Sequence, residues 1–222
     1  MTKKLIIIGA SGFGREVAWL IERINNNKPT WEIVGFLDDN SELKNKQNYG
    51  YPILDVTDDV RAYKDCYFVC AIGASKIRKQ IINKIKCINS SIKFATLIDP
   101  TVEMSKSNLI GEGSIICAHT IITVNANVGE HVILNLDCTV GHEAIINDFT
   151  TVYPSVNISG NVDIGNTTEI GTGTQIIQGI KIGSNSIIGA GATVIRDIPN
   201  NCTAVGSPAK PIKFFDGGTN NA

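Results

Sequence analysis

The sequence lacks several features that would indicate particular classes of protein. No apolar run approaches the roughly 18 residues of a transmembrane helix, so we expect no membrane span. The 20 basic and 21 acidic residues nearly cancel, so nothing favours nucleic acid or an anionic membrane as a partner. The first apolar run covers only residues 5–8 before a glycine, which predicts a buried strand rather than a signal peptide.

Metal-binding and disulfide patterns are also missing. The six cysteines, at positions 66, 70, 87, 117, 138 and 202, form no CxxC pair, and the three histidines add no zinc spacing. We therefore expect no metal site. The thiols are expected to be reduced and mostly buried, as in a cytoplasmic protein.

Residues 1–97 alternate between strand-like and helix-like segments. "KLIIIGA", "WEIVGFLDD" and "YFVCAIGAS" have the composition of buried strands, and "GREVAWLIERI" and "KIRKQIINKIK" have helical spacing. This alternation predicts a small parallel α/β domain. It is too short for a full dinucleotide-binding fold, so we expect half of one.

From about residue 98 a six-residue period replaces the helical pattern. Every sixth residue from Ile110 to Val194 is Ile, Val or Leu, and a second row, four residues further on and running from Ser114 to Ala192, is small or only β-branched except at Ile180. Such a period is typical of a solenoid. Both rows would point inward from short strands, and the three residues between them would form a corner, where glycine is favoured because it tolerates positive φ. Three six-residue sides make one coil. We expect this domain to span residues 98–213, followed by a flexible tail over 214–222.

The turn "GASGFG" follows the first strand and opens the first helix. Its glycines, Gly9, Gly12 and Gly14, do not match GxGxxG. A glycine turn at a helix N-terminus can still present N–H groups to a phosphate, and Asp38 and Asp39 end the second strand, where an acid can accept from a ribose or base. An ordinary strand–helix turn with solvated acids is an equally good interpretation.

His142 and Glu143 are the second and third residues after Val140, which places them together at a corner. A histidine with an ordinary pKa near 6.5 is suited to general-base catalysis, and an adjacent carboxylate can fix its tautomer. An exposed scaffold histidine remains the alternative. One coil further on lies Gly160, which would leave its backbone N–H accessible above His142. His119 and His131 also fall at corners, and we expect them to be structural or merely exposed.

The repeat resembles the hexapeptide acyltransferases, and the ending "AGATVIRDIPNNCTAVGSPAKPIK" is similar to their closing segment. With the front turn and "GHE", the chain resembles the subfamily of sialic acid O-acetyltransferases and nucleotide-amino-sugar N-acetyltransferases (NeuD/PglD-like). The resemblance implies a left-handed parallel β-helix after a half-Rossmann-like domain. It also implies a homotrimer that binds acetyl-CoA between subunits.

Matching motifs imply roles for individual residues. His142 and Glu143 would be catalytic, and Gly160 would donate to the oxyanion. The remaining acetyl-CoA contacts would be Thr151, Thr172, Ala190 and Lys210. The nucleotide-sugar contacts would be Gly9, Ala10, Ser11, Gly12, Asp38, Asp39, Gly73, Ala74 and Ser75. Two departures are Phe13 and Thr151, where many relatives have histidine. Tyr153 and Asp148 are further candidates for lining the cleft.

The function implied is acetyl-CoA-dependent N-acetylation of a nucleotide-linked 4-amino-4,6-dideoxy sugar (UDP-, dTDP- or GDP-linked), in bacterial surface-glycan biosynthesis such as that of O-antigen. O-acetylation of sialic acid or another sugar is the main alternative. A carbonic-anhydrase-like or non-enzymatic β-helix trimer would need metal-binding histidines that the sequence does not offer. A nicotinamide oxidoreductase fits only the first 90 or so residues, and those weakly.

Overall fold

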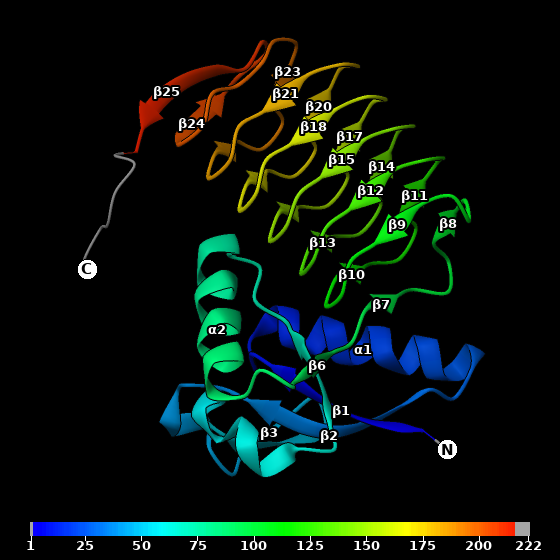
Figure 1. The fold of residues 1–222 in the computed structure, drawn as a ribbon, viewed down its shortest axis with the longest axis vertical. Helices are drawn as coiled ribbons and strands as arrows, with labels where there is room; N and C mark the ends of the chain where they lie inside the picture. The colour runs from blue at the N-terminus through cyan, green and yellow to red at the C-terminus, as the bar shows by residue number, and fades with distance from the viewer. Residues whose placement is uncertain (1, 216–222) are drawn as a thin grey trace.

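The computed structural model describes residues 2–215, in two parts: an α/β domain and a stack of short strands (Figure 1). Within that range no helix has the length and apolarity needed to cross a membrane. The expected tail begins at Phe214, which still belongs to the last strand. From residue 216 onward the tail lies outside the described residues.

The first domain is built on a six-stranded sheet. In spatial order its strands are β3 (Gln47–Asn48), β4 (Tyr51–Asp55), β2 (Trp31–Leu37), β1 (Lys3–Ile8), β5 (Tyr67–Cys70) and β6 (Lys93–Phe94). The helices are α1 (Gly12–Asn27) and α2 (Ser75–Ile88), with 3₁₀ turns at Ser41–Leu43 and Thr57–Tyr63. All neighbouring strands are parallel except β3 and β4, so the expected parallel sheet carries one antiparallel edge.

Side chains of β1 alternate between two apolar layers. Leu5 and Ile7 pack with α1, whereas Ile6 and Ile8 pack in the cluster that contains α2. The layer of α1 also contains Ile115 and Ile133 from the strand stack. Helix α1 therefore lies between the sheet and the stack, as Figure 1 shows, and one continuous core joins the two domains.

The stack is a three-sided parallel β-helix in which every strand but the last pairs with the strand one coil away, as Ile115 pairs with Ile133. The last strand pairs antiparallel with the strand before it. The first face contains β7 (Leu97–Ile98), β10 (Ile115–Ile116), β13 (Ile133–Leu134), β16 (Thr151–Val152), β19 (Glu169–Ile170), β22 (Ile187–Ile188), β24 (Cys202–Val205) and β25 (Lys210–Phe214). The second contains β8 (Glu103–Met104), β11 (Ile121–Ile122), β14 (Thr139–Val140), β17 (Asn157–Ile158), β20 (Gln175–Ile176) and β23 (Thr193–Val194). The third contains β9 (Leu109–Ile110), β12 (Asn127–Val128), β15 (Ile145–Ile146), β18 (Asp163–Ile164) and β21 (Lys181–Ile182).

Both predicted rows of the repeat point inward. The aliphatic row forms the buried core of the β-helix. The polar members of the small row satisfy their hydroxyls on carbonyl groups of the following coil: Ser114 donates to Gly129 over 2.8 Å and Thr150 to Gly165 over 2.9 Å. Small hydroxyl residues are therefore tolerated in this interior because each has a backbone acceptor within reach.

The corners are present, but the expected reason for their glycines, a positive φ, was wrong. The left-handed residue is the third after each aliphatic, at every sixth position from Gly113 to Gly191, and most of these residues are not glycine. The glycines directly after the aliphatics, such as Gly141, have no positive φ. At nearly all of them an added β-carbon would overlap backbone of the next coil, so glycine is needed there for close approach between coils.

A buried guanidinium links α2 to the first face of the β-helix. Arg78 is 1% exposed. Its N–H groups donate, over 2.6–3.2 Å, to the hydroxyl of Thr151 and to five backbone carbonyl groups. These carbonyl groups belong to Ile72, Gly73, His131, Phe149 and Thr150. Burial lowers the pKa of Arg78 to about 10, so the side chain stays charged at neutral pH.

His131 is a core side chain, as the structural interpretation of this histidine predicted. It is fully buried between the rings of Phe94 and Phe149, the latter one coil away. Neither ring nitrogen has a hydrogen-bond partner. Burial, with the nearby charges of Lys86 and Arg78, lowers the pKa of His131 to about 3, so this imidazole is neutral in the folded protein.

This histidine makes the fold sensitive to acid. Below about pH 6.5 the unfolded chain binds a proton at His131, whereas the folded chain does not. The free energy of unfolding therefore falls by about 1.4 kcal/mol for each unit by which the pH is lowered. We expect a loss of about 2 kcal/mol between pH 7 and pH 5 from this residue. Urea unfolding at both pH values should show a smaller loss of unfolding free energy for His131→Phe than for wild type. Phenylalanine is a suitable replacement because the same stack already contains Phe149. The exposed control His119→Phe should behave as wild type, and equal losses in all three proteins would contradict the assignment.

Candidate functional site

The corner between β14 and β15 presents a histidine–carboxylate pair. Glu143 adopts φ 55°, which turns the chain so that its carboxylate accepts from Nδ1 of His142. The two side chains are 48% and 46% exposed, and Nε2 of His142 is left free to face a substrate. The predicted meeting of these neighbours at a corner is confirmed.

Asn125, which lies one coil before Glu143, fixes the position of the carboxylate by a hydrogen bond. Its side-chain amide donates to Oε1 of Glu143 over 3.1 Å. The pKa of Glu143 is lowered by this hydrogen bond and then by that from His142, so the carboxylate remains ionised while it orients the ring. Asn125 is not among the site residues predicted from the sequence, although it lies one coil before Glu143 in the six-residue register.

Gly160 lies directly over the imidazole, on the next coil. The His142 carbonyl accepts from the Asn161 amide over 2.8 Å, and a β-carbon at Gly160 would overlap the ring at Cε1 and Nε2. Among the described residues the Gly160 amide meets no acceptor. A hydrogen-bond donor is therefore free beside the imidazole, as an oxyanion site requires.

Three of the expected acetyl-CoA contacts lie elsewhere on the β-helix. Thr172 and Ala190 are exposed and stacked, one coil apart, at corners between the first and second faces. Lys210 is exposed at the start of β25. The structure thus brings Thr172 and Ala190 together, but on a different edge from His142 and Gly160.

The turn after β1 is fixed by hydrogen bonds to residues outside it. Gly9 has φ 100°, the Ala10 amide donates to Asp38 over 2.7 Å, and Asn48 donates to the Ala10 carbonyl over 2.9 Å. Ser11 is the N-cap of α1, yet its hydroxyl makes no capping bond. The hydroxyl of Ser11 and the first amides of α1 therefore remain available at a helix N-terminus.

Asp39 lines a pocket of about 110 Å³ together with Gly9 and Asp38. Burial raises the pKa of the Asp39 carboxyl, but hydrogen bonds from the hydroxyl and amide of Thr57 outweigh it and leave the pKa lowered. Gly9, which is distant in the sequence from Asp38 and Asp39, is thus brought into one acidic pocket with them.

Residues 73–75 join the two domains. The Ser75 amide and hydroxyl both donate to Glu169, over 2.8 and 2.9 Å, and the Gly73 carbonyl accepts from the Thr151 hydroxyl over 2.7 Å. Ser75 and Thr151 are each 1% exposed. Their hydroxyl groups already serve the interface between domains, so their expected ligand contacts stay predictions that this geometry does not favour.

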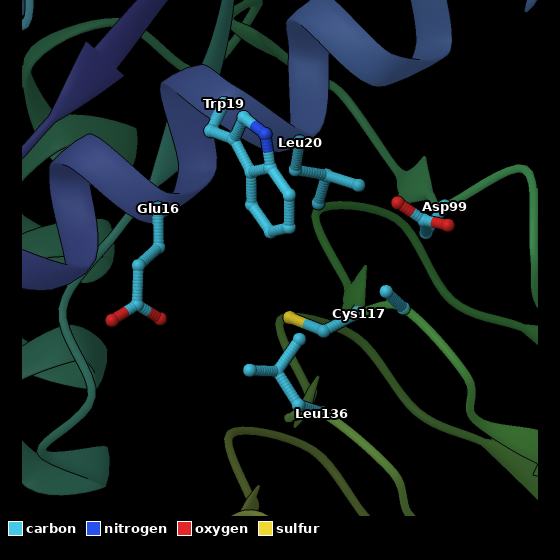
Figure 2. Close-up of a pocket in the computed structure, with 7 residues that line it drawn as sticks. Glu16, Trp19, Leu20, Asp99, Cys117 and Leu136 are labelled. Atoms are coloured by element: carbon cyan, nitrogen blue, oxygen red, sulfur yellow. The ribbon is translucent and has the colours of Figure 1, made fainter.

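A second pocket of about 170 Å³ lies at this interface, and we call it the seam pocket. Its walls are Phe13, Glu16, Gly73, Ile133, Asn135, Thr151 and Tyr153. Tyr153 thus lines a cleft as suggested, whereas Asp148 accepts from the Glu130 amide at another corner. An adjacent apolar pocket, lined by Trp19, Leu20, Cys117 and Leu136, shares Glu16 with the seam pocket (Figure 2).

The two halves of the candidate site are far apart within one chain. The α/β domain and the seam pocket lie against the first face of the β-helix, whereas His142 lies at the edge where the second and third faces meet. In a three-sided helix that edge is opposite the first face. Within the described residues, no group of three or more His, Cys, Asp or Glu is placed to hold a metal ion.

Comparisons with known proteins cover nearly the whole chain. Residues 4–85 match the PglD N-terminal domain, and residues 161–196 match the bacterial transferase hexapeptide (six repeats). GDP-perosamine N-acetyltransferase of Escherichia coli O157:H7 is 30% identical over 215 residues, covering 93% of this chain and 95% of that protein. UDP-N-acetylbacillosamine N-acetyltransferase of Bacillus subtilis (strain 168) is 35% identical over 118 residues, 52% of each chain.

A solved structure shows the same likeness. The acetyltransferase domain of PglB from Neisseria gonorrhoeae FA1090, in complex with acetyl coenzyme A, is 33% identical and aligns with a TM-score of 0.86. The match covers 96% of this chain and all of that domain.

Proposed function

Because the chain belongs to the PglD-like family of hexapeptide-repeat sugar acetyltransferases, we propose that it transfers an acetyl group from acetyl-CoA to the amine of a nucleotide-linked 4-amino-4,6-dideoxy sugar. The fold class is the expected one, a half-Rossmann-like domain followed by a left-handed parallel β-helix. Relatives that act on GDP-perosamine and UDP-N-acetylbacillosamine support an amine as the acceptor.

The single observation that carries the chemistry is the corner at His142. Nδ1 is held by Glu143, so Nε2 can accept the proton that the amine loses as it attacks the thioester carbon. The C–S bond then breaks, and the imidazolium returns the proton to the leaving sulfur. The free amide of Gly160 beside the ring would stabilise the oxyanion formed in between.

A complete site needs more than one copy of the chain. Each side of the β-helix is six residues long, roughly 20 Å of extended chain, and it separates the edge of His142 and Gly160 from that of Thr172 and Ala190. The acidic pocket lined by Asp38 and Asp39 lies on yet another surface. A homotrimer in which the His142 edge of one subunit meets the α/β domain and Thr172 edge of another would account for all three placements.

The proposal predicts which acceptors react. With acetyl-CoA and a panel of UDP-, dTDP- and GDP-linked 4-amino-4,6-dideoxy sugars, we expect at least one amino sugar to release free CoA thiol at a steady rate. The matching 4-hydroxy sugars and sialic acid, tested alongside, should not release it. Turnover with a hydroxyl sugar or sialic acid alone would contradict N-acetylation and favour O-acetylation.

A further inference from the structure

The seam pocket contains a carboxylate that the protein itself does not use. Glu16 lies on α1, one turn after Gly12, and lines the pocket beside Gly73. In the part of the chain that the structure describes, its carboxylate makes neither an ion pair nor a hydrogen bond. Figure 2 shows the carboxylate pointing clear of Trp19 and Leu20. Among the residues that line this pocket, Glu16 is the only acidic one, and none is Lys, Arg or His.

The other walls add neutral polar groups and apolar surface. Oδ1 of Asn135 accepts from the Leu136 amide over 2.8 Å, which leaves its NH₂ group free. The hydroxyl of Tyr153 donates to Glu169 over 3.2 Å, so it can still accept a hydrogen bond. Phe13 and Ile133 complete the pocket. The pocket therefore suits a small ligand with a cationic group, at least one acceptor and an apolar edge.

The position of this pocket relates it to the nucleotide. It is bounded by α1, whose N-terminus follows the Gly9–Gly12 turn, and by Gly73 after β5, whereas Ile72 lines the Asp38–Asp39 pocket. Neighbouring residues of one loop thus line both pockets. The seam pocket is therefore next to the surface where the turn would hold a nucleotide diphosphate.

We infer that the seam pocket holds the sugar and that Glu16 binds its ammonium group, so that this residue selects amino sugars over hydroxyl sugars. This inference rests on the proposed function. Glu16 is exposed on the wall of the pocket. Its carboxylate attracts a cation and gains a charge-assisted hydrogen bond from it, whereas a hydroxyl offers only a weaker one. Glu16 is a specificity residue. The ammonium releases one proton to solvent before attack, and the neutral amine then passes a second proton to His142 of the partner subunit.

The test compares Glu16→Gln with wild type on the 4-amino sugar that wild type acetylates and on its 4-hydroxy counterpart as a competitive inhibitor. Glutamine keeps the shape and removes the charge. At pH 7 we expect KM for the amine to rise at least about 10-fold, with kcat within about 2-fold and inhibition by the hydroxyl sugar unchanged. Above the amine's pKa, about 8 as for an α-amino group, the difference in KM should shrink.

Two further variants separate this role from a structural one. Glu32→Gln removes an exposed carboxylate on β2, near the opposite end of that strand from Asp38, and should change nothing. Asn135→Ala should weaken the amine and the hydroxyl sugar equally, because it removes a neutral donor. If Glu16→Gln acetylates the amino sugar with the KM of wild type, or weakens both ligands equally, the inference is wrong while N-acetylation stands. If wild type uses only hydroxyl sugars, the proposed function and the inference fall together.

Discussion

His142→Ala lowers kcat for acetyl transfer by about 10²–10⁴-fold, the usual contribution of a positioned general base. The fold should not change, because the side chain is half exposed and its one hydrogen bond is to its neighbour Glu143. KM for acetyl-CoA should stay within a few-fold, since the imidazole acts on the amine proton. The measurement is the steady-state rate of thiol release with the preferred amino sugar.

A matched control comes from the same chain. His119 is also exposed at a corner, but on the edge between the first and second faces, so His119→Ala should retain the wild-type rate. A far-ultraviolet circular dichroism spectrum of each variant confirms that the β-helix is intact. A His142→Ala enzyme with more than about a third of wild-type kcat would remove the general-base assignment.

The β-helix and the pair at His142 could be predicted from the sequence because both follow from periodicity. A repeat of six with paired rows fixes which side chains point inward, and it places His142 and Glu143 at a corner and Gly160 one coil above. The same arithmetic reaches Asn125. These relations depend only on distance along the chain, and the structure keeps one register from coil to coil, since Ile121 pairs with Thr139 and Thr139 with Asn157.

Contacts across the two domains could not be found in this way. Glu16, Asn135 and Tyr153 line one pocket only because α1 packs on the first face. Nothing in the sequence states which face that is. The role of Arg78 was hidden for a further reason: in the sequence it is one of several basic residues on an amphipathic helix, for which a solvated position is the usual expectation.

Arg78→Met should lower the free energy of unfolding by about 3–5 kcal/mol, the cost of removing one side of a buried charged network. The loss is large because carbonyl groups of Ile72, His131 and Phe149 would be left without this donor, at about 1–3 kcal/mol for each group left unsatisfied. Methionine fills similar volume, so the change isolates the hydrogen bonds from a cavity. Urea unfolding at pH 7 and at one fixed subunit concentration measures the effect.

Lysine at this position distinguishes charge from geometry. Arg78→Lys keeps a cation, but its three donors radiate from one atom and cannot replace a planar fork that reaches acceptors on two domains, so we expect it to recover less than half of the loss. Lys76→Met, an exposed change on the same helix, should stay within about 0.5 kcal/mol of wild type. If Arg78→Met unfolds at the urea midpoint of Lys76→Met, the guanidinium does not stabilise the domain interface. Because the seam pocket is built on that interface, any loss there should also raise KM for the sugar before it affects kcat.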